Sequence, residues 1–268
     1  MPLGYDGPET HMVVPPTAPF LVRVSVAPRA TAGPPTWPFT LPFVRGLALE
    51  LRSAVTFFVG ENGSGKSTLI EAIAAACGMP VAGGGTNELP DAYAPEGRSA
   101  LGATLRPTFR ARPPDRYFFR AEFQAHLASL LDLRREDPDF GGDPYQRYGG
   151  QSLHERSHGE AFLAVLIHRM TSGLILMDEP EAALSPQRQL ALLARMAEMV
   201  AAGETQFVVA THSPILLTYP GADIVSFDAT PLTSVSLEGT SHYRITKGIL
   251  ENPAQYWRHL TGGAAPPP

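Results

Sequence analysis

Residues 60–67 read Gly-Glu-Asn-Gly-Ser-Gly-Lys-Ser, a glycine-rich loop between two segments of different character. Residues 56–59 before it are apolar and β-prone, and residues 67–76 after it are strong helix formers. A strand that runs through a short loop into a helix is the building unit of α/β folds. We therefore expect an α/β fold with a mainly parallel central sheet and flanking helices.

The loop also carries a specific chemistry, because it fits the pattern G-x-x-x-x-G-K-[ST] that cradles phosphates. A helix start offers unpaired N–H groups and a positive dipole end, and glycines let these amides approach an anion closely. Lys66 is one of only two lysines among the 21 basic residues, and it should reach the outer phosphates. The residues expected to bind nucleotide here are Gly60, Glu61, Asn62, Gly63, Ser64, Gly65, Lys66, Ser67 and Thr68.

Composition limits the class of protein. The net charge of −5 argues against nonspecific coating of nucleic acid, and the single cysteine excludes an internal disulfide. Cys77 is expected to be a small buried apolar residue. No apolar run approaches the length of a membrane span, and the first residues do not resemble a secretion signal. We expect a soluble, cytoplasmic protein without membrane insertion.

The chain is expected to form one domain. We predict a disordered leader over 1–19, a domain over 20–262 and a disordered tail over 263–268; within the domain, 20–85 carry the phosphate loop, 86–150 form an inserted lobe, and 151–262 complete the site. Ser185-Pro186 should open a helix, with Leu190, Leu193, Met196 and Val200 as its apolar stripe. The helical segment that ends near Leu260 should pack on the core.

Two acids follow the apolar run Leu174–Met177, which predicts a strand buried on both faces. Ligands of open α/β sheets bind at the carboxyl ends of the strands, so Asp178 should hold Mg²⁺ together with the hydroxyl of Ser67. Glu179 should point elsewhere and act as a general base toward water. The sequence therefore predicts Mg²⁺-dependent phosphate chemistry.

Two further motifs follow in order. Arg156-Ser157-His158-Gly159-Glu160 precedes the acid pair, and Ala210-Thr211-His212-Ser213-Pro214 follows it at the end of another apolar run. With the phosphate loop and the acids, this set resembles the ABC-type ATPases, whose common signature is L-S-G-G-Q. The chain is most similar to short soluble bacterial ATPases with Ser-His-Gly-Glu and Thr-His-Ser-Pro motifs.

The resemblance implies a P-loop NTPase fold of ABC type, with an antiparallel β lobe and a small helical lobe beside the central sheet. It implies ATP and Mg²⁺ as cofactors, and His212 as a switch that contacts the γ-phosphate beside the catalytic Glu179. Ser157, Gly159 and Glu160 would bind the nucleotide of a second copy, so that two chains pair head to tail around two ATP molecules.

Three assignments stay open in the sequence. The family usually places a glutamine near Mg²⁺, and either Glu122 or Gln124 fits that place; we favour Glu122, which follows its strand more closely. Trp37 or Phe39 could stack on adenine, although core packing is the favoured role for both. Five arginines between 106 and 120 form either a nucleic-acid or partner groove or, as we favour, a solvated face paired with acids.

The function expected is a soluble ATPase that dimerises on ATP and drives or gates an unidentified protein partner. The alternatives are the ATPase subunit of a membrane transporter and a nucleotide-dependent regulator that does not hydrolyse ATP. The Ser-x-Gly-Glu form of the signature argues against the transporter, and the presence of Lys66, Glu179 and His212 argues against the regulator.

Overall fold

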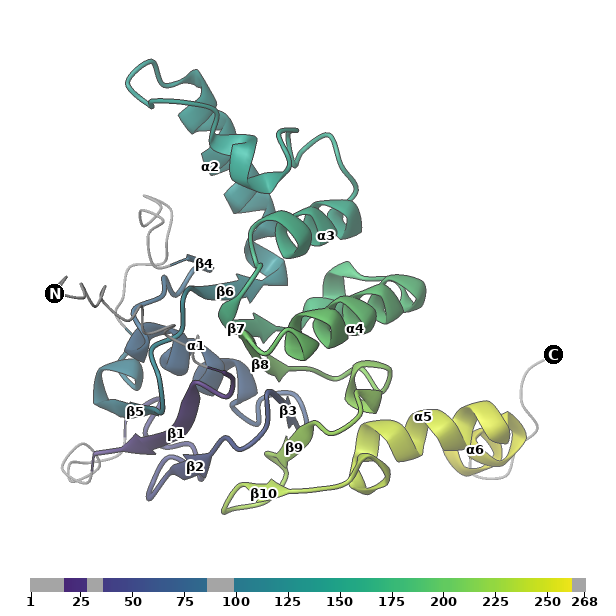
Figure 1. The fold of residues 1–268 in the computed structure, drawn as a ribbon. Helices are drawn as coiled ribbons and strands as arrows, with labels where there is room; N and C mark the ends of the chain where they lie inside the picture. The colour runs from purple at the N-terminus through teal and green to yellow at the C-terminus, as the bar shows by residue number, and fades with distance from the viewer. Residues whose placement is uncertain (1–16, 28–35, 86–98, 262–268) are drawn as a thin grey trace, which may run out of the picture.

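The computed structural model describes residues 17–27, 36–85 and 99–261, apart from the side chains of 123–126. Within these residues seven strands form a mixed sheet (Figure 1). In spatial order they are β10 (Thr233–Ser234), β9 (Asp223–Ser226), β3 (Val55–Val59), β8 (Thr205–Ala210), β7 (Gly173–Asp178), β6 (Arg116–Arg120) and β4 (Gly84–Gly85). The five inner strands are parallel, and the two edge strands pair antiparallel. The predicted mainly parallel sheet is confirmed.

The inner strands are buried on both faces because their sequences are nearly continuous apolar runs. Every residue of β3, β7 and β8 is buried. The start of β7 needs a glycine: Gly173 has a φ of 95°, and a Cβ there would lie 2.0 Å from the Asp115 carbonyl oxygen. These buried strands form a rigid support for the loops that follow them.

A smaller antiparallel sheet packs beside the first. Its order is β2 (Ala48–Glu50), β1 (Leu21–Val26) and β5 (Leu105–Phe109). The buried amide of Gln206 on β8 links the two sheets, because its Oε1 accepts from the N–H groups of Phe20 and Leu21 and its Nε2 donates to the Leu21 carbonyl, each at 2.8 Å. The antiparallel lobe is therefore tied to the central sheet by hydrogen bonds as well as by apolar contacts.

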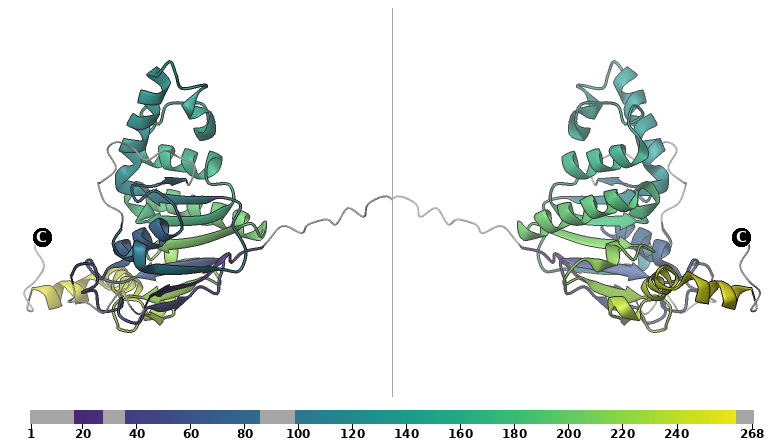
Figure 2. Two further views of the ribbon diagram at one scale, coloured as in Figure 1. Left: turned by 90° about the vertical axis from the view of Figure 1, so that its left-hand side faces the viewer. Right: turned by 90° about the vertical axis from the view of Figure 1, so that its right-hand side faces the viewer.

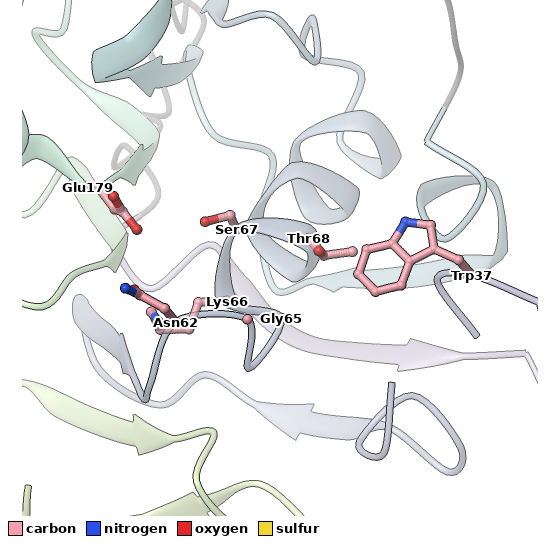
Figure 3. Close-up of a pocket in the computed structure, with 8 residues that line it drawn as sticks. Trp37, Asn62, Gly65, Lys66, Ser67, Thr68 and Glu179 are labelled. Carbon is pink, nitrogen blue, oxygen red and sulfur yellow. The ribbon is translucent and has the colours of Figure 1, made fainter. Parts of the chain in front are cut away.

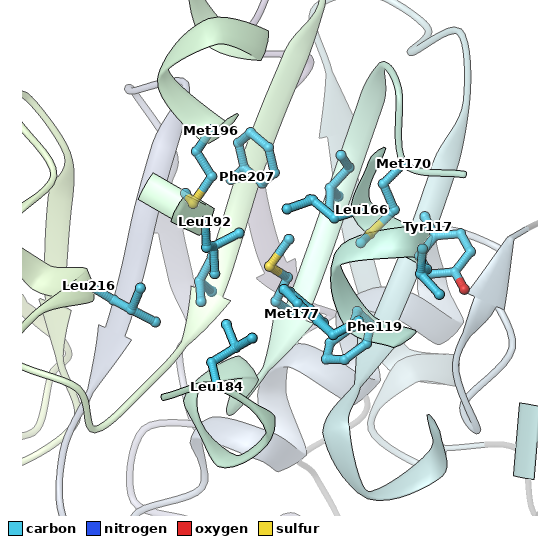
Figure 4. Close-up of a cluster of buried hydrophobic side chains, with 14 of the residues drawn as sticks. Tyr117, Phe119, Leu166, Met170, Met177, Leu184, Leu192, Met196, Phe207 and Leu216 are labelled. Atoms are coloured by element: carbon cyan, nitrogen blue, oxygen red, sulfur yellow. The ribbon is translucent and has the colours of Figure 1, made fainter. Parts of the chain in front are cut away.

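The helices divide between the two faces of the large sheet. The structure has α1 (Lys66–Ala76), α2 (Gln124–Glu136), α3 (His158–His168), α4 (Pro186–Ala201), α5 (Ser241–Glu251) and α6 (Pro253–Leu260). Helix α1 packs with the small sheet in one apolar cluster, and α3 and α4 contribute to the other (Figure 4). Helix α2 rises beyond the β6–β4 edge, while α5 and α6 project near β9 and β10 (Figures 1 and 2).

The predicted apolar stripe of α4 is partly wrong. Leu190 is 58% exposed, and the residues that face the core are Gln189, Leu192, Met196 and Met199. The run from 190 to 193 contains three leucines and an alanine. Successive residues of a helix lie about 100° apart around its axis, so this apolar run fits more than one face of the helix. Contact with β8 selects Leu192 and leaves Leu190 in solvent.

The C-terminal helices also differ from expectation, since none of their residues is buried. They pack on each other, and Leu250 is 75% exposed. Their large apolar side chains are not packed on the sheet, because Ile245, Trp257 and Leu260 are exposed as well. The expected packing of this segment on the core is therefore wrong, and α5 and α6 form an arm, here the C-terminal arm.

Cys77 caps the end of α1 and is buried as predicted. Burial raises the pKa of its thiol to about 12, so the thiolate that reacts with oxidants is scarce at neutral pH. The predicted leader over 1–19 lies mostly outside the described residues, and the tail over 263–268 lies wholly outside them. None of the helices in the described part of the chain has the length and apolarity needed to cross a bilayer.

Candidate nucleotide-binding site

The phosphate loop joins the buried strand β3 to helix α1, as the sequence predicts. Gly60, Gly63 and Gly65 have positive φ values of 152°, 79° and 96°. A Cβ on Gly65 would lie 2.7 Å from the Phe43 ring, and one on Gly60 would lie 2.9 Å from Cβ of Phe227. The loop is thus pressed against the core on one side: conformation and space both require glycine at 60 and 65, and conformation alone favours it at 63.

Lys66 begins α1 and is only 4% exposed. Its Nζ donates to the carbonyl oxygens of Gly60 at 2.6 Å and Glu61 at 3.1 Å. Burial lowers the pKa of the ammonium, while the carboxylates of Glu179 and Asp178 oppose that shift. The Lys66 ammonium is therefore a buried cation that forms no ion pair with a residue of the loop. Such an arrangement favours an anionic ligand.

The ends of three neighbouring parallel strands meet beside this loop. The register pairs Ala210 of β8 with Phe58 of β3 on one side and with Asp178 of β7 on the other. The loop, the acid pair and His212 therefore follow strands that end at the same level. This alignment brings together three of the four predicted motifs.

Ser67 and Asp178 are in direct contact, because the Ser67 hydroxyl donates to Oδ1 of Asp178 at 2.9 Å. Burial raises the pKa of Asp178 to about 6, against the opposing effects of the Ser67 hydrogen bond and of Arg120. A hydroxyl and a buried carboxylate fit Mg²⁺, which takes few protein oxygens and completes its shell with water and phosphate. The described residues contain no cluster of three or more metal-binding side chains, so a metal held by protein alone does not fit.

Glu179 leaves β7 in a left-handed conformation, with a φ of 48° and a ψ of 53°. Its N–H donates to the Ala210 carbonyl at 2.9 Å, which helps to hold this conformation. A non-glycine residue in this region costs roughly 1–3 kcal/mol and is typical of functional sites. The turn directs the carboxylate into a pocket lined by Trp37, Asn62, Gly63, Gly65, Lys66, Ser67 and Thr68 (Figure 3).

His212 lies on the other side of Glu179, with its Nε2 3.5 Å from the Glu179 Oε1. The His212 N–H donates to Oε1 of Glu181 at 2.6 Å, and its Nδ1 lies 2.9 Å from Nε2 of His242. Burial, and next the charge of Lys66, lower the pKa of His212, so the ring is neutral near pH 7. Among the described residues Nε2 is buried without a hydrogen-bond partner, and it can serve a ligand beside Glu179.

Glu122 is placed close to this group through Arg120. The Arg120 guanidinium pairs with Glu122, with Glu71 at 3.2 Å and with Asp178 at 3.8 Å. The Glu122 side chain is mostly exposed and bound to Arg120, while the side chain of Gln124 lies outside the described part of the structure. The choice between Glu122 and Gln124 as a Mg²⁺ neighbour therefore remains a prediction.

The predicted signature residues lie at the start of α3, where Ser157 and Glu160 are exposed and Gly159 is buried beneath the Arg188 side chain. Ser157 caps the helix: its N–H and hydroxyl donate to Oε2 of Glu160 at 2.9 and 2.7 Å, and its Oγ accepts from the Glu160 N–H. Arg188 of α4 adds a hydrogen bond to the Ser157 hydroxyl at 3.1 Å and an ion pair to Glu160. Ser157, Gly159 and Glu160 are absent from the described lining of the pocket, so the chain does not bring them to its own phosphate loop.

Trp37 is not a core residue, and the favoured expectation for it is wrong. Its side chain is 66% exposed and lines the pocket beside Thr68 (Figure 3). Phe39, by contrast, is partly buried against the apolar cluster around α1. A large ring kept in solvent at the rim of a phosphate site is suited to stacking on a flat ligand.

The arginines between 106 and 120 differ in their contacts. Arg116 donates to the Cys77 carbonyl at 2.5 Å, and Arg120 is bound to acids at the site. Arg106, Arg110 and Arg112 are exposed. The favoured alternative, a solvated face paired with acids, describes only the pairing of Arg120, and the groove stays a prediction.

Several residues of the site were missed in the sequence. Asp228 follows β9 and accepts from the Glu61 N–H at 3.0 Å; an acid directly after an apolar run is the same signal that identified Asp178. Arg120 could have been found as a charge that ends a strand next to β7. Arg188 and His242 carry no such local signal, because they reach Ser157 and His212 from distant helices.

Comparisons with known proteins agree with this geometry. A family model described as "AAA domain, putative AbiEii toxin, Type IV TA system" matches residues 160–218, and one described as "AAA domain" matches residues 40–104. The first match contains the acid pair and His212, and the second contains the phosphate loop. No curated protein matches the sequence significantly.

Solved structures of similar fold include ABC transporter proteins and an SMC head domain. An inward-facing "putative metal-chelate type ABC transporter" aligns with a TM-score of 0.49 and 16% identity, covering 85% of this chain and 88% of that one. The protein cbiO1 from Clostridium perfringens, part of an ABC transporter complex, aligns with a TM-score of 0.46 and 16% identity, covering 91% of this chain and 99% of that one. The SMC head domain from Thermotoga maritima aligns with a TM-score of 0.42 and 16% identity, covering 81% of this chain and 98% of that one.

A phosphate loop between β3 and α1, with an acid at the end of the parallel strand β7 and β8 between the two strands, is the arrangement of a P-loop NTPase fold. The small antiparallel sheet, the helical lobe and the two AAA-type matches make this chain an ABC-like P-loop ATPase by fold. The predicted family resemblance and fold class are confirmed.

Proposed function

We propose that this protein hydrolyses Mg²⁺-ATP and that two copies close head to tail on the nucleotide, so that ATP binding and hydrolysis drive or gate a protein partner. The contact between Ser67 and Asp178 is the observation that carries the proposal. This hydrogen bond of 2.9 Å joins the residue after the loop lysine to the acid pair. The exposed Trp37 at the rim supports a base that stacks on its ring.

The residues divide the chemistry between them. The loop amides and Lys66 would bind the phosphates, and Ser67 with Asp178 would hold Mg²⁺, which neutralises phosphate charge when it is bound. The Glu179 carboxylate would accept a proton from the attacking water and orient it. The free Nε2 of His212 would donate to the γ-phosphate on the far side of that water.

The position of Ser157 supports the pairing of two chains. Ser157 caps an exposed helix start, where the helix dipole favours an anion, and within this chain the described contacts place the Glu160 carboxylate there. Its own phosphate pocket is lined by other residues. A second copy arranged head to tail would bring each Ser157 turn to the partner's nucleotide and complete two sites at once.

The test compares the wild type with Glu179→Gln. We expect Mg²⁺-dependent ATP turnover in the wild type and a loss of roughly 10²–10⁴-fold in the variant, the usual contribution of a general base. Nucleotide affinity, measured by titration calorimetry, should be preserved. Because the variant hydrolyses ATP too slowly to release the closed pair, light scattering after gel filtration should show a dimer that depends on ATP.

Glu198→Gln is the matched control, since Glu198 lies exposed on α4 and pairs only with Arg195 among the described contacts. It should leave turnover and dimerisation unchanged. Wild-type turnover in Glu179→Gln would remove Glu179 from the proposed role. ATP binding without turnover in the wild type would instead identify a regulator that does not hydrolyse nucleotide.

A further inference from the structure

The switch histidine has a second histidine behind it. His242 lies in the first turn of α5, and its Nε2 is 2.9 Å from Nδ1 of His212, with ring centroids 5.0 Å apart. Thr240 caps α5 by accepting from the Tyr243 N–H, which fixes the start of the helix. His242 therefore approaches the site from the C-terminal arm rather than from the central sheet.

A hydrogen bond between two imidazole nitrogens has a direction, because one nitrogen donates and the other accepts. Nε2 of His212 faces the Glu179 carboxylate at 3.5 Å. A lone pair there would oppose the negative charge, whereas an N–H would be attracted to it. In a neutral His212, Nε2 thus carries the proton, and Nδ1 must accept from His242.

The remaining nitrogen of His242 fits the same direction. Its Nδ1 lies 3.5 Å from the Ser241 hydroxyl, which can donate to it when Nε2 carries the proton. Burial and the charge of Lys66 keep His212 neutral by lowering its pKa, so its tautomer is a real variable. The hydrogen bond at one imidazole nitrogen then sets the chemistry of the other.

We propose that His242 is a positioning residue: it donates to Nδ1 of His212 and so holds that ring with its Nε2–H directed at the place between Glu179 and the γ-phosphate. The role of the γ-phosphate in this statement rests on the proposed function. The tautomer and the ring orientation rest on the two histidines and Glu179 alone.

The first experiment reads the tautomer without activity. Proton–nitrogen correlation spectra of histidine-labelled protein, free of nucleotide, should show His212 with a bare Nδ1 and a protonated Nε2. His242→Ala should change this to a mixture of tautomers. A pattern at His212 that is identical in wild type and variant would overturn the proposal, whether or not the protein hydrolyses ATP.

The second experiment uses turnover. His242→Ala should lower kcat by roughly 10–100-fold with little change in KM, as expected for a partner that orients a reacting imidazole. His242→Gln can place an amide N–H near the same point and should restore most of the rate. His259→Ala, an exposed histidine on α6, is the control and should behave as wild type.

The outcomes separate the two ideas. A wild type without ATPase activity would refute the proposed function, and the spectra would still decide the role of His242. Equal loss of kcat in the Ala and Gln variants, with a lowered melting temperature, would show that His242 only stabilises the fold. Wild-type kcat in His242→Ala would likewise overturn the positioning role.

Discussion

The phosphate loop and the Ser157 turn are both helix starts that we propose meet a phosphate, yet the protein builds them in opposite ways. Glycines of the loop are pressed against Phe43 and Phe227, and Lys66 is buried. The Ser157 turn is exposed, and its hydrogen bonds are closed on Glu160 and Arg188. One half of the proposed site is preformed in the core, and the other lies on the surface.

This difference assigns separate tasks to the two halves. A buried loop with little room to move pays its ordering cost during folding, so it can bind phosphate in the single chain. An exposed turn contributes only when another surface meets it. Binding should therefore depend on the first half, and assembly on the second.

Lys66→Ala tests this division with the largest expected effect. Removal of the buried ammonium leaves the phosphates without their main counter-charge, and such a loss at a buried ion pair costs about 3–5 kcal/mol. We expect nucleotide affinity to fall by roughly 10²–10⁴-fold in titration calorimetry. The fold should remain, as judged by circular dichroism.

The chain supplies its own control, because Lys247 is its only other lysine. Lys247 is exposed on α5 and lies 3.9 Å from Glu251. Lys247→Ala should bind nucleotide as the wild type does. Equal affinity in the two alanine variants would show that the buried loop is not the binding half.

Much of the preformed half could be predicted from the sequence, because it depends on local patterns. The strand Arg116–Arg120 has the predicted bounds, and β7 extends the predicted run by one residue at each end. Buried runs followed by acids or by the glycine loop identify strand ends directly. The parallel register then brings these ends together without further information from the sequence.

The surface features could not be predicted in this way. Leu190 and Leu192 are the same residue type in one apolar run, and only contact with the sheet decides which of them is buried. The exposure of Trp37 could not be predicted either, since the sequence of a loop does not indicate whether an aromatic side chain in it is buried or exposed. Arg188 and His242 reach the site from helices that are distant in sequence, and tertiary packing alone fixes their partners.

Ser157→Arg tests the surface half. A long charged side chain at this turn would block close approach of a second copy, and burial of an unpaired charge would oppose assembly. We expect monomer affinity for nucleotide to stay near the wild-type value, while the ATP-dependent dimer of the Glu179→Gln background weakens by at least about 100-fold. Analytical ultracentrifugation over a range of protein concentrations measures this shift.

Ser234→Arg is the matched control, because Ser234 is an exposed serine on the edge strand β10. It should leave the dimer intact. Loss of monomer binding in Ser157→Arg would mean that the turn acts within its own chain. A dimer of unchanged strength would remove the turn from the interface.

Asp178→Asn probes the cost of building the preformed half. Burial raises the pKa of Asp178 from 3.8 to about 6, so the folded state binds this proton more tightly than the unfolded state. Without Mg²⁺ and nucleotide, the stability of the wild type should therefore fall as pH rises from about 4 to about 6 and stay lower above that range. The shift corresponds to at most roughly 3 kcal/mol.

The asparagine variant has no charge to bury, and its amide oxygen can still accept from Ser67. Urea unfolding in EDTA should show Asp178→Asn gaining stability over the wild type across that pH window, with the two converging below about pH 4. Asp139→Asn, at an exposed aspartate, should follow the wild type. Parallel pH curves for wild type and Asp178→Asn would mean that the carboxylate is already solvated without its cation, and that this part of the site is assembled by the ligand rather than by the fold.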